Sequence, residues 1–296
     1  MPVMKKHIPM LVTVIVALTA AHPFESMAAD AAARAATVLT EARKALGGED
    51  RLRAVKTLHA SGEYRRSMAD TQMEGELDLM LELPDKLRRD ETIGMPGGAT
   101  MVRTEVLNGT DVWEDSSQRG GMGGHMTMVM RGPGGREMTP DEIRERRRQA
   151  RRADLDRYIL SWLLTTDAVV THAGVAEAPD GTADVLEIDP AAGPAMRLFI
   201  DQRTRLPLML TWQGPQPRTI VRRVSGGPPH ADEPGREAEG PPPQAVFELR
   251  FDEHRSVDGI RLPHHMSRAV NGSITEEWTV RNYKVNTSFK NSTFTK

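Results

Sequence analysis

The sequence has no cysteine among its 296 residues. This absence excludes disulfide bonds, thiolate metal sites and a cysteine nucleophile, and it also excludes the lipid-modified cysteine of a lipoprotein. Aromatic residues are scarce as well, at 4% of the chain. Aliphatic packing and backbone hydrogen bonds must therefore stabilise the fold. Methionine is frequent, with 17 residues, and its flexible thioether side chain suits irregular apolar surfaces.

A strong charge of either sign is also missing. The formal net charge is −2, whereas a protein that binds nucleic acid carries a basic field, so we expect no nucleic-acid partner. No phosphate-binding, hydrolase or zinc-protease motif is present. His264 and His265 are adjacent in an expected strand, so their rings point to opposite faces and cannot share a metal ion. The sequence therefore indicates a non-enzymatic protein with no cofactor.

No apolar run suits a permanent membrane anchor, which needs about 20 residues. The N-terminal run, residues 8–21, follows two lysines and precedes Ser26 and Ala28, small residues at positions −3 and −1 of a cleavage site. This order is typical of a secretory signal peptide, residues 1–28. We expect the remainder, residues 29–296, to be a single domain that is exported to the periplasm.

Two amphipathic helices are expected. Apolar residues recur at spacings of three and four within residues 31–46, and Gly47 and Gly48 end that helix. A long central helix begins at Thr139, where Pro140 and Glu142 are typical of a capping box. The later part of this helix carries an apolar stripe at the i, i+3, i+4, i+7, i+8 spacing. The stripe consists of Leu155, Tyr158, Ile159, Trp162 and Leu163.

Outside these helices, apolar residues alternate with a period of two, which is typical of half-buried antiparallel strands. Turn dipeptides at 108–109, 258–259 and 271–272 connect neighbouring strands. The pattern predicts an α+β, mainly β fold with a large curled antiparallel sheet of about 11 strands, whose concave face the two helices cover. Two segments without periodicity are expected as loops: the Met/Gly-rich residues 116–137 and the mobile, Pro/Gly-rich residues 214–244, with one short strand at 219–224.

Several short motifs carry a family resemblance, and most of them are turns and strand ends. They are residues 45–48, 52–58, 106–113, 197–201 with 206–207, and 255–263. With these motifs the sequence resembles the LolA/LolB-type periplasmic carriers of outer-membrane lipoproteins, and in particular the lipoprotein-sorting proteins of that superfamily. The resemblance implies an unclosed barrel, or half-barrel, with helices plugging a hollow that shelters acyl chains.

The stripe on the central helix is the candidate ligand-binding surface. In a half-barrel, its five residues could line a lipid cavity, and they could equally be the core contacts of any helix that packs on a sheet. The arginines of residues 144–152 could meet anionic headgroups, but acidic residues lie among them. We therefore expect this part of the helix to be a solvated face.

A copper site is the weaker alternative. Thioether and imidazole groups suit Cu(I), and one segment supplies both: Met122, His125, Met126, Met128 and Met130. These residues show no regular ligand spacing, so we favour a flexible apolar lid over a metal site.

Three hypotheses follow for the function. The first is a periplasmic carrier that binds a lipid, a lipoprotein acyl chain or another apolar ligand in a half-barrel cavity. The second is an envelope sensor or scaffold whose partner is another envelope protein, and whose cavity its own side chains fill. The third is a copper-binding protein. A roomy apolar hollow favours the carrier, and a tightly filled one favours the scaffold.

We expect the mature protein to begin at Ala29, because the basic, apolar and small-residue regions occur in the order that signal peptidase requires. N-terminal sequencing of protein purified from the periplasmic fraction tests this expectation. A sequence that begins at Met1, or recovery only with integral membrane proteins, would overturn it.

Overall fold

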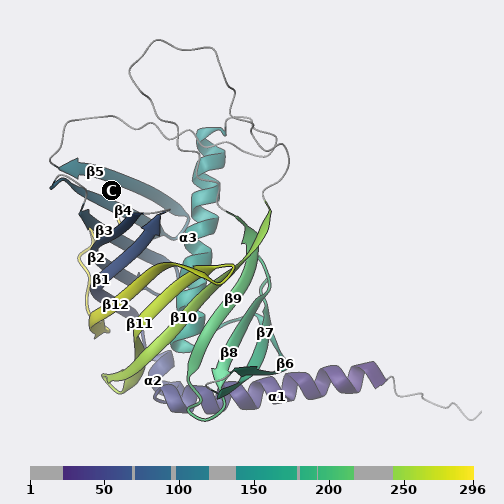
Figure 1. Cartoon of the computed structure of the whole chain (residues 1–296). Coiled ribbons are helices and arrows are strands. Elements are labelled where there is room, and N and C mark those ends of the chain that lie inside the picture. Colours follow the sequence, from purple (N-terminus) through teal and green to yellow (C-terminus); the bar gives the residue numbers. More distant parts are fainter. Residues whose placement is uncertain are drawn as a thin grey trace, which may run out of the picture.

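The computed structural model describes residues 23–68, 71–94, 98–119, 138–178, 181–191, 193–216 and 243–296. In this part of the chain, twelve strands form one antiparallel sheet in the order β5-β4-β3-β2-β1-β12-β11-β10-β9-β8-β7-β6, and three helices accompany it (Figure 1). The predicted class, a mainly β fold built on one large, unclosed antiparallel sheet, is confirmed.

The helices are α1 (Pro23–Leu46), α2 (Glu49–Arg53) and α3 (Pro140–Leu163). The strands before α3 are β1 (Thr57–Met68), β2 (Thr71–Glu82), β3 (Lys86–Gly94), β4 (Thr100–Asn108) and β5 (Asp111–Arg119). Those after it are β6 (Val169–Ala178), β7 (Gly181–Asp189), β8 (Met196–Asp201), β9 (Pro207–Pro215), β10 (Gln244–Val257), β11 (Ile260–Val270) and β12 (Ser273–Val285).

The start of α1 and the end of β5 differ from the sequence prediction. Helix α1 begins at Pro23 rather than at residue 31, because the alanine-rich stretch before Ala35 favours a helix without contributing to the buried stripe. Strand β5 runs to Arg119, so it includes the first residues of the segment that we expected as a loop. The expected short strand at 219–224 lies outside the described residues.

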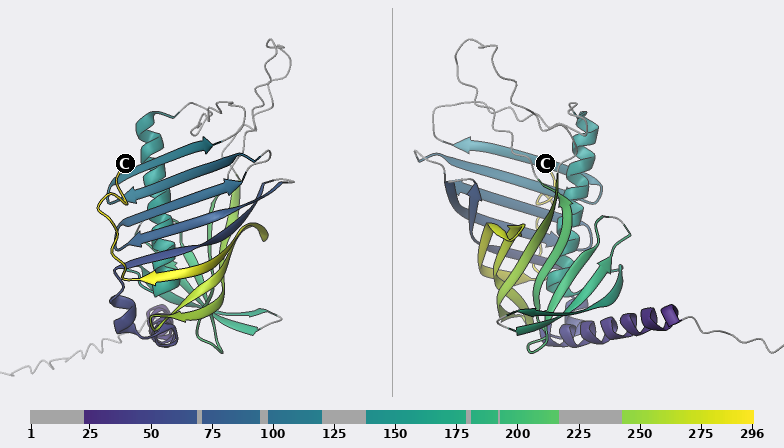
Figure 2. Two further views of the ribbon diagram at one scale, coloured as in Figure 1. Left: turned by 90° about the vertical axis from the view of Figure 1, so that its left-hand side faces the viewer. Right: turned by 45° about the vertical axis from the view of Figure 1, so that its right-hand side comes forward.

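The sheet curls around α3, which stands against its concave face, and α1 lies across one end of the sheet (Figure 2). Helix α3 contacts β3, β4 and β5 on one side of the hollow and β9 on the other, so it bridges the two arms of the sheet. Helix α1 packs against β6 and β11. No helix in the described ranges has both the length and the apolar character needed to cross a membrane.

The predicted turn dipeptides form tight hairpins. Asp258 and Gly259 connect β10 to β11, with φ of 50° and 81°, and both angles suit the mirror-image turn that joins twisted strands. The end of α1 packs on this turn, because a side chain at Gly47 would place its Cβ only 2.3 Å from the carbonyl oxygen of Gly259. Two of the motifs that carry the family resemblance therefore meet at one point of the fold.

The residues after β12 cross the outer face of the sheet. Arg88 Nη1 donates a hydrogen bond to the carbonyl oxygen of Thr293 at 2.7 Å, and Trp113 Nε1 donates to that of Phe294 at 3.4 Å. The Phe294 ring is buried, with 4% exposed, and it packs edge-on against Phe289. This C-terminal segment covers apolar surface on β3 and β5, near the β5 edge of the sheet.

Replacing Phe294 with Ala should lower the free energy of unfolding by up to about 3 kcal/mol, because a buried ring is lost while the chain end is free to detach. Urea unfolding followed by tryptophan fluorescence measures the change. The neighbouring exposed substitution Thr295→Ala is the control and should have little effect. Equal stability of both variants would show that the segment does not brace the sheet.

Candidate functional site

The ends of α3 are fixed by capping contacts. The backbone N–H of Glu142 donates to Thr139 Oγ1 at 3.3 Å, and the backbone N–H of Thr139 donates to the Glu142 carboxylate at 2.9 Å, so the predicted capping box is confirmed. At the other end, Leu164 adopts the left-handed conformation with φ of 51°. Its carbonyl oxygen accepts hydrogen bonds from Nε and Nη2 of Arg43 at 3.1 and 2.9 Å, which ties α3 to α1.

The apolar stripe of α3 faces the concave sheet. Leu155, Tyr158, Trp162 and Leu163 are at most 2% exposed, and Ile159 is half-buried against the same core. Helical spacing therefore predicted which side of α3 packs inward. That these residues line a ligand site stays a prediction.

Aromatic rings from the sheet complete this surface. Tyr158 lies 5.1 Å from Trp162 and 5.8 Å from Trp278 between ring centroids, and Trp162 meets Tyr283 edge-on at 5.8 Å. Trp278 and Tyr283, both of strand β12, are not among the residues predicted from the sequence to form this surface. Alternation with exposed residues was a usable signal for the inward orientation of Trp278. Tyr283 has the opposite parity, and it faces the same side only because a bulge between Val280 and Asn282 shifts the register of β12, which a period-two pattern does not predict.

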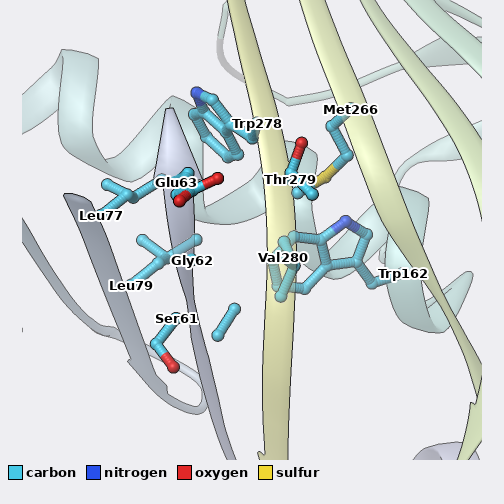
Figure 3. Close-up of a pocket in the computed structure, with 11 residues that line it drawn as sticks. Ser61, Gly62, Glu63, Leu77, Leu79, Trp162, Met266, Trp278, Thr279 and Val280 are labelled. Atoms are coloured by element: carbon cyan, nitrogen blue, oxygen red, sulfur yellow. The ribbon is translucent and has the colours of Figure 1, made fainter. Parts of the chain in front are cut away.

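A small cavity lies beside this aromatic group (Figure 3). Its volume is about 10 Å³, which is room for about one water molecule at most, whereas small-molecule sites measure about 300–1,000 Å³. It is lined by Ala60, Ser61, Gly62, Glu63, Leu77, Leu79, Trp162, Met266, Trp278, Thr279 and Val280. The apolar half of the hollow is thus filled by the protein's own side chains.

The other half of the concave face is charged. Arg89 Nε donates to Glu91 at 2.6 Å and its Nη2 donates to Glu276 at 2.5 Å, while Arg66 reaches the same two carboxylates at 2.9 and 3.2 Å. Arg89, Glu91 and Glu276 are all less than 9% exposed. Two arginines and two carboxylates therefore form a buried, neutral group on strands β1, β3 and β12.

The charged half of α3 packs on this half of the sheet. Arg151 Nη2 donates to Glu105 at 2.7 Å, and Arg147 lies 3.3 Å from Glu114. The prediction of a solvated arginine face is therefore wrong for these two helix residues. It holds for the others, which are exposed or partly exposed: Arg144, Arg146, Arg148 and Arg152. Strands β3 and β4 carry charges of alternating sign among their inward positions, a period-two signal that the sequence analysis did not use.

The pKa values of the buried carboxyl groups reflect these pairs. Burial alone would raise the pKa of Glu276, but Arg89, Arg268 and Arg66 outweigh it and hold that pKa far below its ordinary value of 4.5. The same balance, with Arg89 and Arg66 prevailing over burial, lowers the pKa of Glu91. These carboxylates remain ionised in the folded protein well into the acid range.

The metal-site alternatives gain no support here. His264 is buried, with its Nδ1 2.8 Å from the carbonyl oxygen of Val280, while His265 is half-buried on the opposite face, as the strand pattern predicted. Among the described residues, no group of three or more His, Asp or Glu side chains could hold a metal ion. The candidate copper ligands lie outside the described residues: Met122, His125, Met126, Met128 and Met130.

No family model and no curated protein matches the sequence. Among solved structures, the chain is similar to a LolA superfamily protein from Nitrosomonas europaea, at 13% identity with a TM-score of 0.48, covering 88% of this chain and 97% of that one. It is also similar to an outer membrane lipoprotein-sorting protein domain from Vibrio parahaemolyticus, at 12% identity with a TM-score of 0.44, covering 89% and 97%. A DUF1329 family protein from Desulfovibrio piger follows at 10% identity and a TM-score of 0.42, covering 86% and 96%.

The likeness is structural and the sequence identity is low.

The buried carboxylates predict how stability depends on pH. Because the folded pKa of Glu276 is depressed, its contribution is complete above the unfolded pKa of about 4.5 and is lost as pH falls towards the folded pKa. Glu276→Gln should cost about 3–5 kcal/mol at pH 7, since it leaves Arg66 and Arg89 with only one carboxylate, Glu91, between them. It should also make unfolding less pH-dependent below about pH 5.

Urea unfolding at a series of pH values from 7 to about 3 measures both effects. The exposed Glu253→Gln is the matched control and should follow the wild type. If Glu276→Gln and the wild type lose stability in parallel on acidification, the buried group of two arginines and two carboxylates is not the source of the pH dependence.

Proposed function

We propose that this protein is a non-enzymatic periplasmic carrier that binds a lipid, a lipoprotein acyl chain or another apolar ligand between α3 and the concave face of the sheet. One observation carries the proposal. The aromatic rings of Tyr158, Trp162, Trp278 and Tyr283 meet at the seam between the helix and the sheet, beside a small cavity lined mostly by apolar side chains. The expected signal peptide and the family resemblance of the sequence agree with this proposal.

An apolar ligand must displace side chains to enter, because the cavity is too small for it. Entry of a ligand would break the packing between side chains of α3 and side chains of the sheet. The backbone hydrogen bonds of the sheet would stay intact, because α3 is not one of its strands. A chain that buries about ten methylene groups gains about 8 kcal/mol. Loss of a Trp side chain from a core costs about 3–5 kcal/mol. An opening of the seam in which the Trp162 indole leaves its contacts with the sheet and packs against the acyl chain is therefore energetically accessible.

A second function, an interaction module for another envelope protein, is favoured by the filled hollow. The sheet is unclosed, and β5 and β6 each pair with one strand only in the described part of the chain. An edge strand offers free backbone groups to which a partner can add a strand. In this alternative the helix would stay in place and the partner would bind at an edge.

Replacing Trp162 with Phe tests the carrier proposal, because Phe retains most of the apolar volume. The wild type should bind a fluorescent fatty-acyl probe saturably with micromolar affinity. Trp162→Phe should weaken this binding by more than it weakens folding, which a fluorescence titration and a parallel urea unfolding curve measure.

Trp113→Phe is the matched control, because Trp113 lies on the outer face of the sheet and touches the C-terminal segment. It should leave probe affinity unchanged. If the folded wild type shows no saturable binding, the carrier proposal fails and the interaction module remains.

A further inference from the structure

A positive excess lies inside the hollow. The ion pairs between α3 and the concave face, with the buried group beside them, involve seven arginines but only five carboxylates among the described residues. The arginines are Arg66, Arg89, Arg103, Arg147, Arg151, Arg157 and Arg268, and the carboxylates are Glu91, Glu105, Glu114, Asp154 and Glu276. Two positive charges in this set are therefore not balanced.

The excess is concentrated at Asp154. Its Oδ1 lies 3.2 Å from Arg157 and 3.8 Å from Arg268, while its Oδ2 lies 3.0 Å from Arg151. Arg151 has a second carboxylate in Glu105. Arg157 and Arg268 have no other carboxylate in ion-pair distance among the described residues, so Asp154 is the one carboxylate in direct contact with both guanidinium groups. Glu276 acts on Arg268 only from a greater distance.

Both arginines also keep an unused donor. The Nε atoms of Arg157 and Arg268 are buried and have no hydrogen-bond partner within the described structure. An unpaired buried donor is costly, and more so when the group is charged. Burial, with Arg268 nearby, lowers the pKa of Arg157 despite the contact with Asp154. An additional anion at this point would satisfy the donors and the charge together.

The arginine pair adjoins the apolar half of the hollow. Arg157 stacks on the Trp212 ring, 4.0 Å from its centroid, and Arg268 lies 5.2 Å from the centroid of Trp278. Arg268 Nη2 donates to the Tyr158 hydroxyl at 2.7 Å, and the Tyr158 ring packs on Trp162, which lines the cavity. The positive pair thus adjoins the aromatic seam directly, and a single tyrosine side chain separates Arg268 from Trp162.

We propose that Arg157 and Arg268 bind the anionic group of an amphiphilic ligand whose acyl chain occupies the apolar half of the hollow. This inference rests on the proposed carrier function and names its ligand class: a single-chain or multi-chain lipid with an exposed phosphate or carboxylate. Two guanidinium groups suit such an oxyanion, because their planar donors pair with its oxygens. A neutral amphiphile leaves both donors unsatisfied and binds less tightly.

Two lipids that differ only by a phosphate test the proposal: lauroyl lysophosphatidic acid and monolauroylglycerol. Isothermal titration with each, below its micelle concentration, should give the phosphate lipid an affinity at least about tenfold higher. Inorganic phosphate alone, at the same concentration, should neither bind measurably nor displace the lipid, because it lacks the acyl chain.

Arg157→Gln should bring the two lipid affinities close together, and Arg157→Lys should retain part of the difference because it keeps the charge. Arg146→Gln is the matched control on the solvent side of the same helix, and it should bind as the wild type does. Circular dichroism confirms that each variant is folded. If Arg157→Gln does not fold, the comparison of the two lipids on the wild type still decides.

Equal affinity for both lipids would overturn the anionic site and leave the carrier function standing. Binding of neither lipid would overturn both. Tight binding of inorganic phosphate alone would overturn the amphiphile, since the site would then recognise an anion without a chain. A preference for the phosphate lipid that survives Arg157→Gln would place the anionic group elsewhere and contradict the assignment.

Discussion

The fold depends on how α3 matches the concave face of the sheet. The first half of the helix is charged and packs against carboxylates on β4 and β5, whereas the second half is apolar and packs against the aromatic and aliphatic half of the hollow. The helix bridges the two arms of an unclosed sheet. Without it, the concave face of both arms would be open to water, and the sheet would lose most of its core.

The charged half of this interface contributes less to the free energy of folding than apolar packing of the same size would. Removing ions from water costs several kcal/mol each, and apolar side chains of similar size often give a more stable protein. The ion pairs do, however, determine where the helix lies. A slide of one turn, about 5.4 Å, would separate Arg151 from Glu105 and move charges towards the aromatic seam. We interpret these ion pairs between α3 and the sheet as the interactions that fix the position of the helix along the sheet. The apolar half of the hollow can then adapt without a shift of the helix.

Local patterns in the sequence were sufficient to predict the elements and their order. The dipeptides at 258–259 and 271–272 predicted their hairpins because only left-handed residues fit these turns, and the spacing from Leu155 to Leu163 predicted the buried side of α3. Burial also depends on contacts between distant segments, which one sequence does not reveal. For this reason the mixed charges of α3 predict a solvated face even at Arg147 and Arg151, and the pattern of β12 does not show that Trp278 meets Tyr158.

The central claim is that the seam between α3 and the sheet opens for an apolar ligand. Native mass spectrometry of the protein purified from its own envelope tests it most directly, because a retained lipid is weighed together with the chain. The account predicts a folded protein that carries one lipid with an anionic headgroup, and loss of this lipid after Trp162→Phe. A folded wild type that shows only the mass of the polypeptide, and takes up no lipid when mixed with envelope extract, would contradict it.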